Sequence, residues 1–257
     1  MQRLVKFARL VTHFVSGLLI LALRFRHYTA SRRLAEIRRW SRKFLRLAGV
    51  RLELAGQAPS AGLIVMNHIS WLDVIVLNAL APSRFVSKAE VARWPLVGYL
   101  CTKSGTLYIE RSRKTAARRT NRLIAEALAN GERVAVFPEG TTTAGDQLLH
   151  FHAALLQPAI ASAGFAHPAA LRYLDPAGGR SPAVSYVGAE TLLGSIWQLL
   201  GVKRVVARIE FGRAEPAAGR SRRELASALH ATISRQLCLE CLHKEPGTRA
   251  GHRSGPR

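Results

Sequence analysis

The chain has 257 residues, with 38 Lys and Arg against 16 Asp and Glu and a net charge of +22. This length is enough for a sizeable domain with its own core, and a hydrophobic fraction of 48% excludes a wholly disordered chain. Three cysteines are too few for a disulfide scaffold and favour a reducing compartment. The sequence has no run of about 18 consecutive apolar residues, which argues against a polytopic membrane protein. The excess of positive charge indicates an anionic partner: nucleic acid, a membrane surface or a phosphorylated substrate.

The first apolar segment is a run without charged residues from Leu10 to Leu23. This run is short for a membrane-spanning helix and fits a buried, interfacial or re-entrant segment. Cations precede it, as in a signal peptide, but Arg24 and Arg26 follow it where a signal peptide would carry small residues for cleavage. We therefore expect a retained membrane anchor.

The next segment is predicted to form a basic amphipathic helix that ends at Gly49, a residue suited to a helix C-cap. Its apolar residues recur at helical spacing: Leu34, Ile37, Trp40, Phe44, Leu45 and Ala48. Arginines and lysines surround this stripe, a pattern that binds anionic lipid headgroups. The alternative is a helix packed on the domain with a solvated basic face. Membrane association is favoured because the segment directly follows an apolar run. If that run spans a membrane, the heavier positive charge after it places the body of the protein on the cytoplasmic side.

Nucleic acid is a weaker explanation of the charge. The sequence carries none of the usual spacings of nucleic-acid-binding modules. Its positive charge is also concentrated beside apolar residues, which nucleic acid does not require. We expect no nucleic-acid partner.

A turn-rich break at residues 56–62 divides the chain into a helical segment (1–55), a domain (56–239) and a tail without periodicity (240–257). Within the domain, a helical pattern at 114–130 ends at Gly131. Short apolar runs predict strands at 63–66, 84–87, 106–109, 134–137, 169–173, 183–186 and 205–211. This alternation predicts an α/β fold with a mixed, largely parallel sheet flanked by helices, preceded by an N-terminal membrane-associating helical pair.

One candidate site follows the first predicted strand, in the sequence NHISWLD from Asn67 to Asp73. A histidine with a nearby carboxylate can act as a base, because the carboxylate fixes the imidazole tautomer and stabilises the imidazolium. Five residues is an awkward separation within a regular helix. His68 is therefore expected at or before the start of the helix that carries Asp73. On spacing alone, ordinary structural polar residues remain the alternative.

A second candidate, FPEGTT, also follows a predicted strand. Glu139 supplies an acceptor, Gly140 permits a close backbone approach, and Thr141 supplies a hydroxyl donor. A capped turn with threonine at the N-cap is the structural alternative.

A third candidate, GTLYIER, runs from Gly105 to Arg111 and ends a strand with an arginine. A guanidinium suits a phosphate because it is always charged and can bind two oxygens at once. An isolated surface arginine is the alternative in so basic a chain.

Taken together, in their order along the chain and at their separations, the three motifs resemble the blocks of the glycerophospholipid acyltransferases, the lysophosphatidate acyltransferase group. NHISWLD matches their NHxxxxD block, GTLYIER their second and FPEGTT their third, and residues 168–171 resemble the fourth. The resemblance covers about residues 60–215. The third block departs from the family pattern with Thr142, where an arginine is frequent.

The resemblance implies acyl transfer from a thioester to the free hydroxyl of a lysolipid, with 1-acylglycerol-3-phosphate as the default acceptor and phosphatidate as the product. His68 would be the general base and Asp73 would orient it. The residues implied in substrate binding are Asn67, Gly105, Arg111, Glu139, Gly140 and Thr141.

No metal is implied, and no cofactor beyond the co-substrate, which is acyl carrier protein or coenzyme A as an acyl thioester. The implied location is the bacterial inner membrane, with an anionic membrane surface as a partner and the catalytic domain facing the cytoplasm. In the family's bacterial layout the helical pair dips into one leaflet, so residues 4–26 are expected to be monotopic. A lyso-ornithine acceptor, or a membrane-docking protein of the same fold without catalysis, stays open. So does a zinc knuckle at Cys238, Cys241 and His243, although its ligand set is incomplete.

Overall fold

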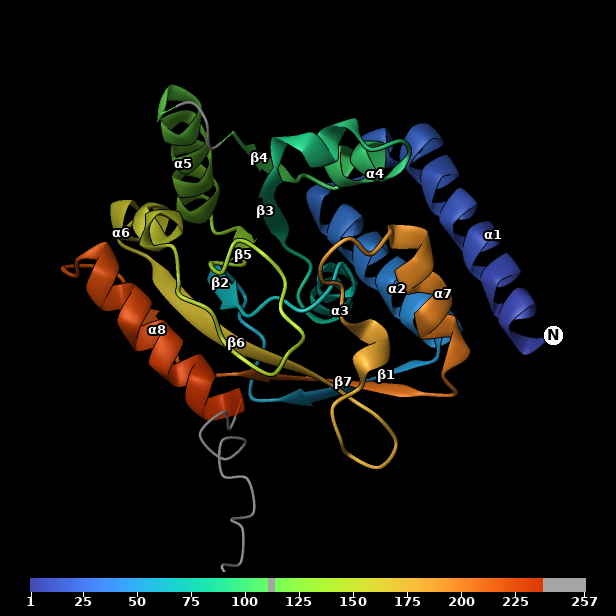
Figure 1. Cartoon of the computed structure of the whole chain (residues 1–257). Coiled ribbons are helices and arrows are strands. Elements are labelled where there is room, and N and C mark those ends of the chain that lie inside the picture. Colours follow the sequence, from blue (N-terminus) through green and yellow to red (C-terminus); the bar gives the residue numbers. More distant parts are fainter. Residues whose placement is uncertain (111–113, 238–257) are drawn as a thin grey trace, which may run out of the picture.

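The computed structural model describes residues 1–110 and 114–237, and its centre is an eight-stranded sheet (Figure 1). The strands are β1 (Val50–Ala55), β2 (Gly62–Met66), β3 (Arg84–Lys88), β4 (Leu107–Ile109), β5 (Arg133–Val136), β6 (Phe165–Leu174), β7 (Val205–Phe211) and β8 (Glu215–Pro216). Seven lie in the order β1-β7-β6-β2-β5-β3-β4, and β8 pairs with β6. The neighbours from β6 to β4 are parallel, as are β1 and β7, whereas β7 and β8 run antiparallel to β6. The expectation of a mixed, largely parallel sheet is confirmed.

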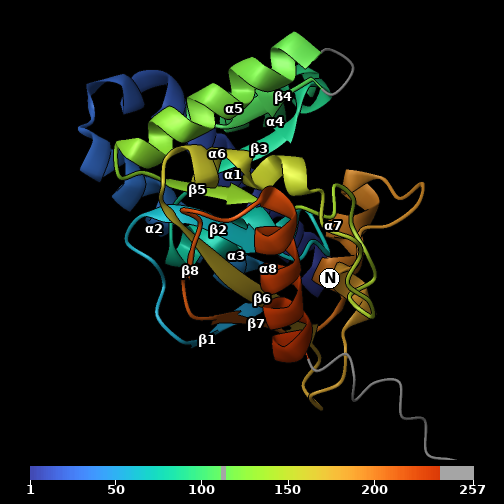
Figure 2. The ribbon, with the colours of Figure 1, turned by 90° about the vertical axis from the view of Figure 1, so that its left-hand side faces the viewer.

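Helices cover both faces of this sheet (Figures 1 and 2). They are α1 (Gln2–Leu23), α2 (Ala30–Ala48), α3 (Leu72–Leu80), α4 (Val97–Lys103), α5 (Lys114–Ala129), α6 (Gln157–Ala161), α7 (Leu192–Gly201) and α8 (Arg222–Leu237). Short 3-10 helices are η1 (Phe25–His27), η2 (Ala89–Arg93), η3 (Ala153–Leu156) and η4 (Pro182–Val184). In β2, Ile64 and Met66 join the core beneath α2 and α3, while Leu63 and Val65 join the core beneath α5 and α8. Burial on both faces explains why this strand reads as a continuous apolar run.

The predicted elements agree with the structure at all but one of the expected strands. The sequence 183–186 is not a strand: residues 182–184 form η4, and the chain then continues as an irregular loop. Pro182 opens η4, and the backbone N–H of Tyr186 donates to the carbonyl of Ile69 rather than to a neighbouring strand. Val184 is buried in the core beside the β2–α3 loop. In the sequence, such a short apolar stretch resembles a strand.

Strand β1 was missed because its residues were assigned to the N-terminal segment. Val50–Ala55 pairs in parallel with β7 over its whole length, so the sheet begins before the turn-rich break at 56–62. The expected division at residue 55 stays a prediction, but these six residues belong to the sheet.

The two N-terminal helices pack against each other and against the domain. Trp40 of α2 stacks on His13 of α1 with ring centroids 4.9 Å apart, and each residue donates a side-chain hydrogen bond to the other's carbonyl oxygen. As expected, α2 ends at Gly49, whose φ of +82° is a left-handed C-cap conformation. By length and composition α1 could cross a membrane, and only 17% of its apolar window is buried in the protein.

Candidate active site

Two of the candidate motifs follow neighbouring parallel strands. NHISWLD begins directly after β2 and FPEGTT directly after β5, and β2 pairs with β5 from Gly62 to Val65. The carboxyl ends of parallel strands lie at the same edge of a sheet, where α/β proteins place their sites. The topology therefore brings the two loops side by side.

His68 lies in the loop before α3, and Asp73 lies in the first turn of that helix. The Nδ1 atom of His68 is 2.8 Å from Oδ2 of Asp73, so the neutral imidazole donates its Nδ1 proton to the carboxylate. The ring of His68 stacks on Phe137, with centroids 4.0 Å apart and planes 14° apart. Its side chain is 21% exposed, and within residues 1–110 and 114–237 no side chain or backbone group binds its Nε2 atom. The imidazole is thus oriented from one side and available to a substrate from the other.

Asp73 is completely buried, and both of its oxygens accept hydrogen bonds. Oδ2 accepts from the backbone N–H groups of Ile69 at 2.7 Å and Ser70 at 3.0 Å, in addition to His68. Oδ1 accepts from the hydroxyl of Tyr173 on β6 at 2.8 Å. Burial and the charge of Asp73 raise the pKa of Tyr173 well above its ordinary value, so this hydroxyl stays protonated and keeps donating. The sequence analysis did not identify Tyr173, because a tyrosine hydroxyl on a strand residue does not by itself indicate a partner such as Asp73.

Glu139 holds the backbone of the loop that carries His68. Its Oε1 atom accepts from the backbone N–H of His68 at 2.7 Å, and Oε2 accepts from that of Leu149 at 2.9 Å. Burial raises the pKa of Glu139, and the two backbone donors oppose that shift. The carbonyl of His68 in turn accepts from the N–H of Thr143, so both backbone groups of His68 are bound to the loop after β5.

Asn67 joins β2 to β6 where their pairing ends. Its side-chain Nδ2 donates to the carbonyl of Leu171 at 3.0 Å, and its Oδ1 accepts from the N–H of Leu171 at 2.7 Å. The amide group therefore continues the strand ladder and frees the following residue, His68, to leave the sheet. Its assignment to substrate binding stays a prediction.

Three further predicted substrate-binding residues lie in the described part of the chain, two of them in the loop after β5 and one between α4 and β4. Gly140 closes the turn after Phe137 with a φ of +71°, and Thr141 beside it is exposed. Gly105 turns the chain between α4 and β4 with a φ of +89°, and its carbonyl accepts from Nε of Arg84. Arg111 lies outside the described residues, as do the three residues of the proposed zinc knuckle. These assignments stay predictions.

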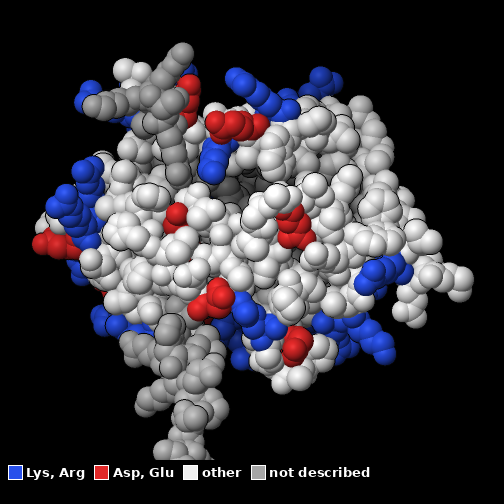
Figure 3. Space-filling view, viewed as in Figure 1, with Lys and Arg blue, Asp and Glu red and all other residues white. Residues whose placement is uncertain are grey.

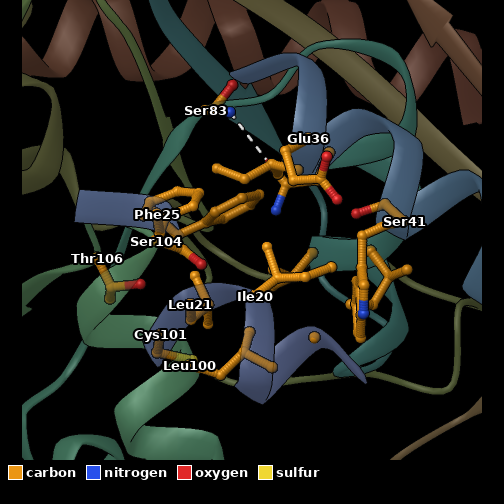
Figure 4. Close-up of a pocket in the computed structure, with 17 residues that line it drawn as sticks. Ile20, Leu21, Phe25, Glu36, Ser41, Ser83, Leu100, Cys101, Ser104 and Thr106 are labelled. Carbon is orange, nitrogen blue, oxygen red and sulfur yellow. Dashed lines mark hydrogen bonds between the residues drawn. The ribbon is translucent and has the colours of Figure 1, made fainter. Parts of the chain in front are cut away.

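An apolar cavity lies between the N-terminal helices and the catalytic domain (Figure 4). Ile20 and Leu21 project into it from α1, and Leu100 and Cys101 line it from α4. Phe85 also lines it and stacks on Phe137 with ring centroids 6.1 Å apart, and Phe137 also stacks on the ring of His68. The cavity is thus linked to the histidine through two aromatic rings.

Comparisons with known proteins agree with this arrangement. A family model described as Acyltransferase matches residues 27–172. The chain is 37% identical to the 1-acyl-sn-glycerol-3-phosphate acyltransferase of Neisseria meningitidis, over 61% of each chain. It is 38% identical to the lyso-ornithine lipid O-acyltransferase of Pseudomonas aeruginosa, over 68% of this chain and 67% of that protein. The match thus spans about three-fifths of the length of the Neisseria relative.

A solved structure shares the fold. The crystal structure of the 1-acyl-sn-glycerophosphate acyltransferase PlsC from Thermotoga maritima matches with a TM-score of 0.65 and 17% identity. The match covers 96% of this chain and 100% of that one. It includes the N-terminal helices as well as the sheet.

Proposed function

The chain belongs to the acyltransferase family, and on this premise we propose that it moves a fatty acyl group from a thioester to the free hydroxyl of a lysolipid. The acceptor we favour is 1-acylglycerol-3-phosphate, which would give phosphatidate. The observation that carries the proposal is the His68–Asp73 pair, with one imidazole nitrogen bound to the carboxylate and the other open. This arrangement suits general-base catalysis.

In the proposed reaction, Nε2 of His68 removes the proton of the lysolipid hydroxyl as its oxygen attacks the thioester carbonyl carbon. The tetrahedral intermediate collapses, the carbon–sulfur bond breaks, and the imidazolium returns the proton to the leaving thiolate. Asp73 stays ionised throughout and stabilises the transient imidazolium. No protein nucleophile is required, because the thioester already activates the acyl group.

The residues around this pair would act by holding it in place. Glu139 fixes the backbone of His68, and Tyr173 fixes the carboxylate of Asp73. Pre-organised groups of this kind need no rearrangement as charge develops. Both are proposed as positioning residues, because neither reaches the open Nε2 atom.

The apolar cavity offers a place for the acyl chain. It is lined by side chains of α1, α2, α3 and α4 and approaches His68 through Phe85 and Phe137. An acyl chain lying there would leave water, which is favourable by about 0.8 kcal/mol for each buried methylene group. Its thioester end would then lie near the imidazole. The donor could be carried by acyl carrier protein or by coenzyme A, and both are anionic.

A lyso-ornithine lipid is the second candidate acceptor. The relative of that name in Pseudomonas aeruginosa matches over a longer stretch than the Neisseria relative, at similar identity. The loop after β5 also has Thr142 at a position where the resembled family frequently has an arginine. Here the Thr142 hydroxyl donates to the carbonyl of Tyr186, so the residue connects two loops.

We further propose that the N-terminal helices associate with the cytoplasmic face of a bacterial inner membrane. The lysolipid acceptor is a membrane lipid, and only 17% of the apolar stretch of α1 is buried in the protein. Figure 3 shows this surface as a largely uncharged area at the upper right, with Lys and Arg spread around the other edges of the view. A protein of this fold that only docks on membranes, without catalysis, is the remaining alternative.

The test is acyl transfer by membranes that contain the full chain, measured by lipid mass spectrometry. The acceptors are lysophosphatidate, other lysophospholipids and lyso-ornithine lipid, each with acyl carrier protein and coenzyme A donors. We expect phosphatidate from lysophosphatidate, and no product with His68→Ala. Product from lyso-ornithine lipid alone would select the second acceptor. If the folded protein yields no product with any acceptor, the alternative of a membrane-docking protein without catalysis is favoured.

A further inference from the structure

The loop between η2 and α4 places large apolar side chains on the protein surface. Its residues are Trp94, Pro95 and Leu96, and the exposed fractions of Trp94 and Leu96 are 41% and 59%. Neither side chain lines the apolar cavity or contacts the His68–Asp73 pair. The proposed acyl transfer therefore does not account for them.

The backbone of this loop is unfavourable for the residue that it carries. Leu96 has a φ of +61° and a ψ of −47°, and the N–H of Val97 donates to the carbonyl of Pro95 at 2.6 Å. This is a γ-turn of the strained kind, in a region of φ and ψ that bulky L residues rarely adopt. Glycine would relieve the strain, yet a leucine stands there with its side chain in solvent. An exposed leucine held at a cost in backbone energy is more readily explained by function than by folding.

The loop is also fixed to the two helices that flank it in the chain, η2 and α4. The N–H of Gly98 donates to the carbonyl of Trp94 at 2.8 Å, and the N–H of Leu100 donates to that of Leu96 at 3.0 Å. A Cβ atom at Gly98 would lie 2.3 Å from the carbonyl oxygen of Ala92, so only glycine lets α4 approach η2 this closely. The two apolar side chains thus project from a fixed support.

The apolar surface continues onto α1. This helix exposes large apolar residues at intervals of seven and then four residues, along one side: Leu4, Val11, Val15, Leu19 and Leu23. Helix α4 packs against the second half of α1, where Leu100 and Cys101 face Ile20 and Leu21 across the cavity. The loop that precedes α4 therefore lies next to the C-terminal half of α1.

Helix α7 extends the same surface at the other end of α1. Trp197 packs edge-on against Phe7 with ring centroids 6.1 Å apart, and both Trp197 and Leu193 are exposed. They lie four residues apart, on one face of α7. On its buried face, Ser195 accepts a hydrogen bond from the indole N–H of Trp71 in the loop that carries His68. This helix connects the surface to the catalytic loop.

The chemistry of the surface fits an anionic bilayer. The guanidinium of Arg3 lies 5.9 Å from the ring centre of Trp197, and Nζ of Lys103 lies 5.7 Å from that of Tyr99. Tryptophan and tyrosine beside cations are the residues that settle at the boundary of headgroups and acyl chains. A second copy of the chain fits less well, because each copy carries a net charge of +22 and would repel the other.

We propose that the loop at residues 94–96 and the Leu193–Trp197 face of α7 dock on an anionic bilayer together with α1. The catalytic domain then contacts lipid directly instead of being tethered by its N-terminal helices alone. This inference extends the membrane association proposed for residues 1–55 and rests on it. It does not depend on the acyl transfer.

Binding is measured by titrating the full chain, diluted from detergent, with vesicles of phosphatidylcholine and phosphatidylglycerol in the absence of substrate. Leu96→Asp and Leu193→Asp are each expected to weaken vesicle binding about tenfold, the effect of moving one leucine side chain out of an apolar layer. Leu54→Asp is the matched control, because Leu54 is also exposed but lies on the edge strand β1, away from α4 in Figure 1. Its binding should equal that of the unmodified chain.

Leu96→Gly separates docking from folding. It removes the side chain and relieves the backbone strain, so it should weaken binding several-fold while the melting temperature stays the same or rises. In a second measurement, vesicles with brominated phosphatidylcholine should quench the fluorescence of Trp94, and Trp94→Phe should remove that quenched component.

Three outcomes would overturn the proposal. The first is unchanged vesicle binding by folded Leu96→Asp and Leu96→Gly. The second is a Trp94 fluorescence that brominated lipid does not quench. The third is a dimer, observed by sedimentation, that Leu96→Asp dissociates. Acyl transfer to a short-chain lysolipid in detergent micelles is measured separately. Weakened binding with no acyl transfer by any form would contradict the proposed function and leave the docking surface standing.

Discussion

The loop that carries His68 and helix α1 use their side chains in opposite ways. Around that loop, His68, Asp73 of α3 and Glu139 after β5 each have hydrogen-bond partners at 2.7–3.0 Å, and Asp73 alone accepts four such bonds. In α1, large apolar side chains are exposed along the helix from Leu4 to Leu23, and the helix contacts α2 through His13 and Gly17 and α7 through Phe7. Hydrogen bonds fix the polar groups of the first region in position, whereas the exposed side chains of the second form an apolar surface, which suits a partner without a fixed geometry.

This difference predicts where substitutions matter. A change of one atom in the loop should alter the reaction, because several partners depend on each group. A change of similar size on the exposed side of α1 should matter little, because partition into lipid depends on summed apolar area. The following experiments test that contrast, from the largest expected effect to the smallest.

His68→Ala should have the largest effect. Removal of the proposed base is expected to lower kcat by about 10²–10⁴-fold or more, the usual value of positioned proton transfer. The ring is partly exposed, so the fold should persist, and circular dichroism with thermal melting checks this. Unchanged turnover in folded protein would remove His68 from the mechanism.

Glu139→Gln should come next. An amide cannot accept from the backbone N–H groups of both His68 and Leu149 through both of its terminal atoms, so one donor is left unpaired. We expect a loss of about 1–3 kcal/mol in the free energy of unfolding and a fall in kcat of about tenfold to a hundredfold as His68 shifts. Denaturant unfolding and steady-state kinetics measure the two effects.

The same variant tests a dependence on pH. Burial raises the pKa of Glu139, so the folded state binds this proton more tightly than the unfolded chain does. Its contribution to stability therefore falls as the pH rises from the ordinary carboxyl range through the raised pKa, and is constant above it. The stability difference between the original protein and Glu139→Gln should shrink over that window. A difference that grows with pH there would contradict the assignment.

Tyr173→Phe should have a moderate effect. It removes one hydrogen bond to Asp73 and nothing that touches substrate, so kcat should fall about tenfold while KM changes little. The less stabilised carboxylate would favour the imidazolium more strongly, and the acidic limb of the pH profile should move to higher pH. A fall in stability with an unshifted pH profile would restrict Tyr173 to a structural role.

Gly17→Ala should have the smallest effect, and it tests the close contact of α1 with Trp40 of α2. A Cβ atom there would lie 2.5 Å from Nε1 of Trp40, so α1 must move away from α2. Overpacking of this kind costs about 1–3 kcal/mol, and the melting temperature should fall by a few degrees. Val15→Leu, two residues away on the exposed side, should change neither stability nor turnover. Equal effects of the two substitutions would contradict the contrast between the regions.

Much of the fold could be predicted from local patterns. The run LIVM after a glycine, the helix that ends at Gly131 and the strand 205–211 each have a clear periodicity or a clear end, and each is present. The pattern fails at residues 183–186, where the chain forms the end of η4 and then an irregular loop. Strand β1 was missed because it pairs with β7, about 155 residues further along the chain. A single sequence carries no signal of that pairing.

The candidate site divides in the same way. His68 and Asp73 could be predicted because NHISWLD follows a predicted strand and resembles the NHxxxxD block of the acyltransferases, whereas their spacing alone was ambiguous. The supports of the pair could not, since Tyr173 and Leu171 come from β6 and act only once that strand lies beside β2. Asn67 is predicted to bind substrate, and its amide group is bound to the backbone of Leu171, a partner that the motif does not reveal. Short motifs predict candidates for the reacting groups, but not the groups that hold them.

The bond between Asp73 and Tyr173 has a consequence for the order of events during synthesis. The two residues are 100 positions apart, and Asn67 and Leu171 are 104 apart. Contacts across such distances in the chain form late, because a long loop must close first. Helix α1 leaves the ribosome well before β6 does, so the helix proposed to associate with a membrane is available while the His68–Asp73 pair still lacks its support. If α1 and the pair act as proposed, the nascent chain reaches the membrane before it can react there.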